Sequence, residues 1–164
     1  MWARLWRKRL NRKTMKISFY CESKIKDEEA LRLKAYKCAS GKWTIGWGHT
    51  EGVRPGMTIV EEQAQELFIE DVEEVESFLR EEPYYPRLSD GQLDALVSFI
   101  FNVGRGHFST STLRKKLMRN VNDATIPDEF RRWVYGTDPV TKKKVKLPGL
   151  VRRREWEAQL YEDL

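Results

Sequence analysis

Three side chains that can do chemistry follow one another at short intervals: Glu29, Cys38 and Thr44. A carboxyl group at the end of a helix can face polar groups of an adjoining β-hairpin across a cleft. In glycoside hydrolysis, one carboxylic acid protonates the leaving oxygen, and in inverting enzymes a second group across the sugar activates water. Glu29 can serve as this acid if dry surroundings favour its protonated form. The alternative is a solvated side chain within the acidic run 27–29.

The residues around these three suit a ligand with flat rings. Gly46 and Gly48 would let another backbone or a polymeric ligand approach closely. Tyr36, Trp43 and Trp47 offer flat faces to sugar rings or to bases. The segment therefore fits a polysaccharide-binding cleft, although the pattern alone is weak evidence for one.

The elements that must position this segment are a short helix and a hairpin. Ser23 is a candidate N-cap for a helix over 24–29. Alternating apolar and polar residues over 31–38 predict a strand, and 43–50 predicts a second strand after a turn. A β-hairpin that follows a helix is the result.

Helices are expected over most of the remaining chain. Capping and periodicity signals predict a helix from the Thr58–Glu61 capping box to Leu79, one from Ser89 to Gly104, one from Ser109 or Thr110 to Asn120, one over 126–136 and one over 150–164. The stretch 137–149 is expected to be an exposed loop. The sequence thus predicts an α+β, mainly α fold, with a small N-terminal hairpin lobe, a helical lobe and a cleft between them.

Composition and charge indicate one soluble-type globular domain with an uneven surface. The 164 residues are 40% apolar and 34% charged, with a net charge of +5. Ten acidic residues and one arginine fall in 61–82, whereas fourteen basic and four acidic residues fall in 105–154. A positive surface of this kind attracts polyanions, including nucleic acid, anionic lipid and anionic cell wall.

Residues 1–14 are expected to be an extension of a catalytic domain that spans 15–164. They carry six basic and no acidic residues, with tryptophan and leucine at helical spacing. This segment is either an amphipathic helix on an anionic membrane or a frayed basic tail. The chain has no apolar run long enough to span a membrane and no signal-peptide pattern. We therefore expect it to stay in the cytoplasm until it is released.

Cysteine and histidine usage predicts no metal site and no cofactor. Cys21 and Cys38 are too few for a disulfide scaffold, although one disulfide between them is compatible with the sequence. His49 and His107 lie far apart, and no metal-ligand spacing is present.

Three separated segments resemble the phage-type lysozymes, the endolysins of glycoside hydrolase family 24. The segment 25–50 resembles their active-site signature, in which a catalytic Glu is followed after eight residues by Asp or sometimes Cys, and after five more by Thr. The segments 88–117 and 147–161 resemble the central and C-terminal helices of the family. The resemblance implies a muramidase that hydrolyses the β-1,4 bond between N-acetylmuramic acid and N-acetylglucosamine.

The resemblance also implies roles for individual residues. Glu29 would be the proton donor, and Thr44 would hold the attacking water. Cys38 stands where Asp is usual: a neutral thiol cannot replace the carboxylate charge, whereas a thiolate could. Outside the family, Cys38 would be a small buried apolar residue. Ala30 stands where the family usually has Gly, which would strain the backbone if its φ is positive.

Three further residues are expected near the substrate. His49 either contacts it or hydrogen-bonds the helix that carries Glu29. Asn102 and Phe108 either contact substrate or pack at the end of the central helix. Peptidoglycan is the implied partner. The protein is expected to act on the periplasmic cell wall after its release, as a monomer and without nucleic acid. Two alternatives stay open: a lytic transglycosylase on the same bond, and a catalytically inactive module that binds cell wall or nucleic acid.

Overall fold

The computed structural model describes residues 16–38, 40–138 and 140–163, which form a mainly helical structure with two small antiparallel sheets. Its helices are α2 (Phe19–Glu29), α3 (Glu61–Arg80), the 3-10 helix η2 (Tyr85–Arg87), α4 (Asp90–Val103), α5 (Arg105–Thr110), α6 (Thr112–Arg119), α7 (Ile126–Arg131) and α8 (Pro148–Glu162). Its strands are β1 (Arg32–Lys37), β2 (Trp43–Gly46), β3 (Tyr135–Thr137) and β4 (Lys144–Lys146). The predicted fold class is confirmed, and the predicted extension 1–14 lies outside the described residues.

Helix α2 begins earlier than the sequence predicted. Ser18, not Ser23, is its N-cap, and the Ser18 hydroxyl accepts a hydrogen bond from the Cys21 amide at 3.1 Å. The reason is a tertiary contact, because the Ser18 amide donates to a carboxylate oxygen of Asp94 in α4 at 3.0 Å. Buried Cys21 and Ile25 then hold the helix against the core.

The predicted N-terminal hairpin is present and is held on both edges. Strands β1 and β2 pair antiparallel, with Tyr36 opposite Thr44. On the other edge of β1, the Ala35 amide donates to the Met57 carbonyl, and the Ile59 amide donates to the Leu33 carbonyl, both at 2.9 Å. The hairpin is therefore fixed between its own return strand and the segment that leads into α3.

Helices α3 and α4 form the centre of the core. The predicted Thr58–Glu61 capping box is wrong, because α3 is capped at Val60, whose amide donates to the Gln63 side chain at 3.0 Å. In α4 the predicted cap is confirmed: the Ser89 hydroxyl and the Gln92 side chain form a reciprocal capping box. The buried apolar stripe of α3 packs against α4, whose residues 92–100 are all buried.

The C-terminal half departs from the prediction in two places. Ser111, not Ser109 or Thr110, caps the helix α6, and the short helix α5 precedes it. The predicted helix over 126–136 ends at Arg131, and the expected loop 137–149 contributes β4, which pairs with β3. Helix α8 is confirmed and packs against α4 and α7.

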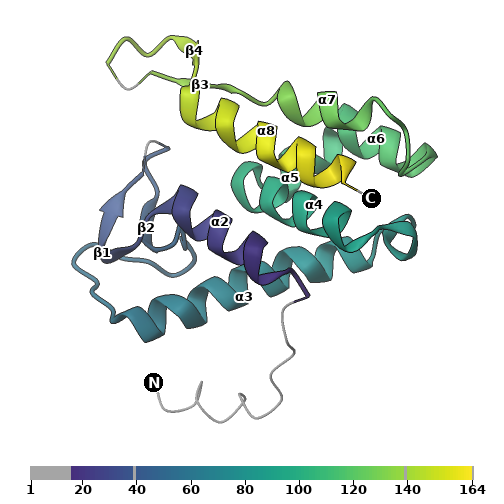
Figure 1. Cartoon of the computed structure of the whole chain (residues 1–164). Helices are drawn as coiled ribbons and strands as arrows, with labels where there is room; N and C mark the ends of the chain where they lie inside the picture. Colours follow the sequence, from purple (N-terminus) through teal and green to yellow (C-terminus); the bar gives the residue numbers. More distant parts are fainter. Residues whose placement is uncertain (1–15, 39, 139, 164) are drawn as a thin grey trace.

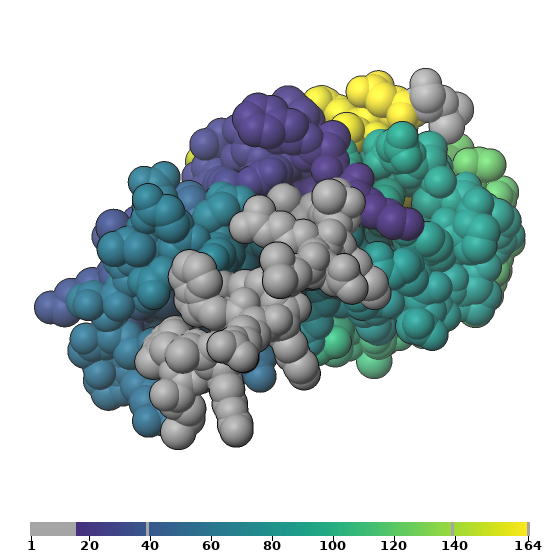
Figure 2. All heavy atoms as spheres, turned by 90° about the horizontal axis from the view of Figure 1, so that it is seen from below, coloured from purple at the N-terminus to yellow at the C-terminus, as the bar shows by residue number. Residues whose placement is uncertain are grey.

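The arrangement places the hairpin lobe beside the helical lobe. Figure 1 shows β1, β2, α2 and α3 on one side and the helices α4–α8 on the other, with the β3–β4 hairpin projecting from the start of α8. From below, residues coloured blue to teal, which include α3, form most of the visible face, and part of α8 is seen beyond α2 (Figure 2). The end of α2 therefore lies where the two lobes meet.

Candidate active site

Glu29, the last residue of α2, lies at this junction. One of its carboxylate oxygens is hydrogen-bonded to α8, and the other lies near the segment that follows β2. Its Oε1 accepts a hydrogen bond from Nη1 of Arg153 in α8 at 2.5 Å. Its side chain is 21% exposed, whereas that of Arg153 is 3% exposed. A Cβ at Gly48 would lie 3.3 Å from Glu29 Oε2, so the glycine after β2 allows the hairpin to come close to the acid. Glu29 is thus oriented by α8 and faces the hairpin.

A buried charged cluster lies behind Arg153 and was not anticipated. Arg154 and Glu157 are 0% exposed, and Arg154 Nη2 donates to Glu157 Oε1 at 3.0 Å. Burial raises the pKa of Glu157, while the two arginines and the Ser98 hydroxyl stabilise its ionised form. The i,i+4 spacing of Arg153 and Glu157 is a sequence signal for a helical ion pair, but it does not indicate that the pair is buried.

Cys38 and Thr44 lie at the turn end of the hairpin. Cys38 Sγ is 3.0 Å from the Ser40 hydroxyl oxygen, and hydrogen bonds with Ser40, followed by Thr44, lower the pKa of the thiol to about 7. Thr44 is 3% exposed, and its hydroxyl also donates to the Lys42 carbonyl at 3.3 Å. A substantial fraction of Cys38 is therefore thiolate at neutral pH.

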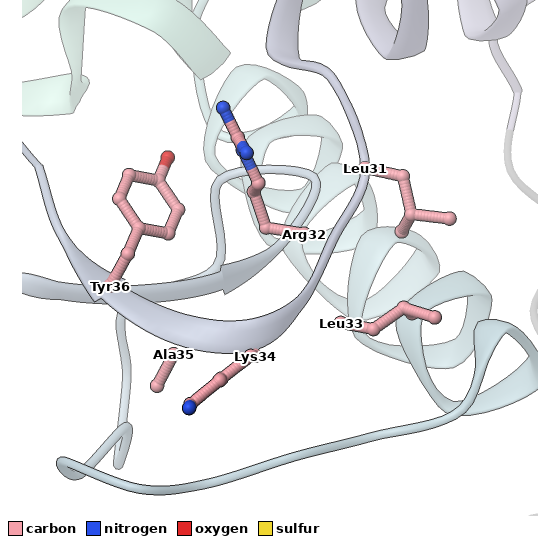
Figure 3. A pocket seen from close by; sticks show the side chains of 6 residues that line it. All are labelled: Leu31, Arg32, Leu33, Lys34, Ala35 and Tyr36. Atoms are coloured by element: carbon pink, nitrogen blue, oxygen red, sulfur yellow. The ribbon is translucent and has the colours of Figure 1, made fainter.

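Tyr36 is within electrostatic reach of both the candidate acid Glu29 and the Cys38 thiol. It stands opposite Thr44 in the hairpin, and its pKa is raised by burial and then by the negative charges of Glu29 and Cys38. Figure 3 shows Tyr36 and Arg32 on the same side of β1, and the Arg32 guanidinium carbon lies 5.8 Å from the Tyr36 ring centroid. Both residues line a pocket formed by 31–36, so this pocket offers an aromatic face and a cation.

His49 hydrogen-bonds α3 and the end of its own hairpin. Its Nδ1 lies 2.9 Å from an Asp71 carboxylate oxygen, and its Nε2 lies 2.9 Å from the Glu51 carbonyl oxygen, two acceptors that the protonated ring satisfies together. These bonds join the end of the hairpin to α3, so the predicted bond to the helix that carries Glu29 is wrong. Asp71 raises the pKa of His49, and both ring nitrogens are already used.

Asn102 and Phe108 are not equivalent. Asn102 is exposed near the end of α4. Phe108 is 0% exposed and packs edge-to-face against Phe78 and Phe99, with ring centroids 6.0 and 6.4 Å apart. The expected contact of Phe108 with substrate therefore does not fit this packing, whereas Asn102 has an accessible side chain.

Neither a membrane-spanning helix nor a metal-binding cluster is present among residues 16–38, 40–138 and 140–163. No helix among them has the length and apolarity needed to cross a membrane. Among the same residues, no three His, Cys, Asp or Glu side chains are grouped to hold a metal ion.

Comparison with known proteins assigns the chain and its fold to one family. The family model described as phage lysozyme matches residues 26–157. The chain is 43% identical to an endolysin of Acyrthosiphon pisum secondary endosymbiont phage 1, over 84% of this chain and 92% of the relative. It is 40% identical to the endolysin of Salmonella phage P22, over 86% and 95%.

A solved structure agrees. The muramidase domain of SpmX from Asticaccaulis excentricus superposes with a TM-score of 0.72 at 31% identity, covering 90% of this chain and 98% of that one. Sequence and structure therefore lead to the same conclusion: the chain belongs to the phage lysozyme family.

Proposed function

We propose that the chain is an endolysin, a muramidase that hydrolyses the β-1,4 bond between N-acetylmuramic acid and N-acetylglucosamine in bacterial peptidoglycan. The observation that carries the proposal is the placement of Glu29, a partly exposed carboxylate held by Arg153 and facing the hairpin of Cys38 and Thr44. The family assignment and the endolysin relatives support hydrolysis as the reaction. Residues 15–164 form the catalytic domain in this proposal.

The proposed chemistry divides between the two lobes. Glu29 gives its proton to the leaving glycosidic oxygen while the sugar bond breaks. On the other side of the sugar, Thr44 holds a water molecule. The Cys38 thiolate takes a proton from this water while the water oxygen attacks the anomeric carbon. The products are a new reducing end and a free hydroxyl on the neighbouring sugar. Asn102, exposed near the end of α4, is proposed to contact the glycan.

Substitution of the acid tests this function. Glu29→Gln should abolish the release of reducing ends from purified murein while the circular dichroism spectrum stays that of the wild type. Glu28→Gln is the matched control, because Glu28 precedes it in the same helix and is exposed. Near-full activity of Glu29→Gln would refute the assignment of the acid.

A lytic transglycosylase is the second candidate, and Cys38 is the observation that favours it. Such an enzyme also uses one acid but needs no second carboxylate to activate water, and the second position of this chain carries a thiol. Mass spectrometry of digested muropeptides separates the reactions, because hydrolysis leaves reducing ends and transglycosylation leaves anhydro-sugar ends. Binding of murein with neither product would instead identify an inactive wall-binding module.

Residues 1–14 are proposed to contact an anionic membrane as the protein reaches the periplasmic wall. Their six basic residues and spaced tryptophans support this role. Deletion of 1–14 should weaken lysis of intact Gram-negative cells more than digestion of bare murein. Equal losses on both substrates would show that the segment acts on catalysis or stability instead. Size-exclusion chromatography with light scattering tests the proposed monomer.

A further inference from the structure

The arginine that holds Glu29 also serves a second, fully buried carboxylate. Arg153 uses Nη1 for Glu29 Oε1, Nε for Glu157 Oε1 at 3.3 Å, and Nη2 for the Ser98 carbonyl at 3.2 Å. All three guanidinium nitrogens thus have partners, and one cation is shared between two carboxylates. The position and the effective charge of Arg153 at Glu29 therefore depend on Glu157.

Glu157 in turn accepts hydrogen bonds from three side chains. Its Oε1 accepts from the Ser98 hydroxyl at 2.6 Å, from Arg154 and from Arg153. An ionised carboxylate, which is an acceptor only, satisfies all of these donors. Arg153, Arg154 and Glu157 then carry one net positive charge in a region closed to solvent, where screening is weak.

This net positive charge opposes the protonation that a proton donor needs. A proton donor must be protonated before it reacts, and a nearby cation favours the ionised carboxylate. Arg154 adds to the positive charge behind Arg153, and Glu157 subtracts from it.

We propose that Glu157 is a positioning residue that offsets the positive charge of the buried arginines and holds Arg153 in place to orient Glu29. The inference rests on the proposed role of Glu29 as proton donor. Glu157 itself acts only through Arg153 and touches neither substrate nor the reacting atoms.

Other charged and titratable groups also face Glu29 and must stay constant in a test. Tyr36 of the hairpin is within electrostatic reach of both Glu29 and the Cys38 thiol, and Arg32 lies over Tyr36. Glu28 adjoins Glu29 in α2, and its charge also reaches Arg154. Substitutions confined to α8 leave these four groups unchanged, so they cannot produce opposite shifts in two α8 variants.

The test compares the pH dependence of Glu157→Gln and Arg154→Met with that of the wild type. Initial rates of reducing-end release from purified murein, with kcat and KM, would be measured from pH 4 to 9. The limb of the kcat/KM profile that depends on Glu29 should move down by about one pH unit in Glu157→Gln and up by about one unit in Arg154→Met, because each variant removes one weakly screened charge near the acid. Arg152→Met is the matched control: it removes the same charge from an exposed position of the same helix and should leave the limb in place.

Folding is checked separately, because removing one partner of a buried ion pair is destabilising. If Glu157→Gln does not fold, Arg154→Met decides alone, since it keeps the Arg153–Glu157 pair. Limbs that stay in place, or that move in the same direction in both variants, would overturn the proposal. A wild-type protein that releases no reducing ends would instead refute the proposed function, so the two failures are distinguishable.

Discussion

The thiol of Cys38 should govern the activity on the acidic side of neutrality. Ser40 and Thr44 lower its pKa to about 7, so the thiolate fraction rises with pH through the neutral range. One unit below the pKa about 10% is thiolate, and one unit above about 90% is thiolate. If the thiolate takes the proton from water, the ratio of the kcat/KM of the wild type to that of Cys38→Asp should rise roughly ninefold between pH 6 and 8. The carboxylate introduced by Cys38→Asp is ionised throughout this range and both proteins share Glu29, so the ratio reports the thiol alone.

The assay is reducing-end release from purified murein between pH 5.5 and 8.5. Cys38→Ser should lower kcat on the order of 100-fold, because a hydroxyl does not ionise in this range. Iodoacetamide should inactivate the wild type, and Cys21→Ala should stay active and equally sensitive, because Cys21 is fully buried and burial raises its pKa. A Cys38→Ser variant with the wild-type rate and pH profile would reduce the thiol to a packing role and refute the reasoning.

Three further predictions concern stability. Ala30 has φ +53°, a strained conformation for a residue with a side chain. Relief of this strain, on the order of 1–2 kcal/mol, exceeds the entropic cost of glycine, so Ala30→Gly should raise Tm by about 1–4 °C. The control Ala124→Gly, at an exposed alanine without a positive φ, should lower Tm. Asp71 raises the pKa of His49, so this pair stabilises the fold below the unfolded pKa of histidine and loses its effect as pH rises through the folded pKa. Asp71→Asn should therefore lower the free energy of unfolding in urea more at pH 6 than at pH 9, and an equal loss at both would contradict the ion pair. Phe108→Ala should lower stability by about 3–5 kcal/mol with little change in KM, and a raised KM in a folded variant would restore Phe108 to the substrate site.

Features whose hydrogen bonds close within a few residues could be predicted from the sequence. The Ser89–Gln92 capping box and the positive φ of Gly104 set the ends of α4, and both lie beside the residues they affect. The hairpin of β1 and β2 follows from alternation and a turn. These elements depend on capping, turn and strand preferences of residues that lie within the element or directly beside it.

Features that depend on distant partners were missed or misplaced. Helix α2 starts at Phe19 because Ser18 binds Asp94, which lies 76 residues further on. The basic run 105–154 was expected to form a positive surface, yet Arg153 and Arg154 within it are buried by contacts with Glu29, Ser98 and Glu157. No local pattern distinguishes the exposed Arg152 from these two buried arginines until α8 is packed on α4.

The contact between Glu29 and Arg153 has a consequence for the timing of activity. The two residues are 124 positions apart, and the ribosome makes α8 after the whole of the hairpin lobe. A nascent chain that ends before Arg153 carries the acid, the thiol and the threonine, yet it lacks the arginine that orients the acid. A lytic enzyme built in this way gains its ordered acid only after α8 has been made and has packed.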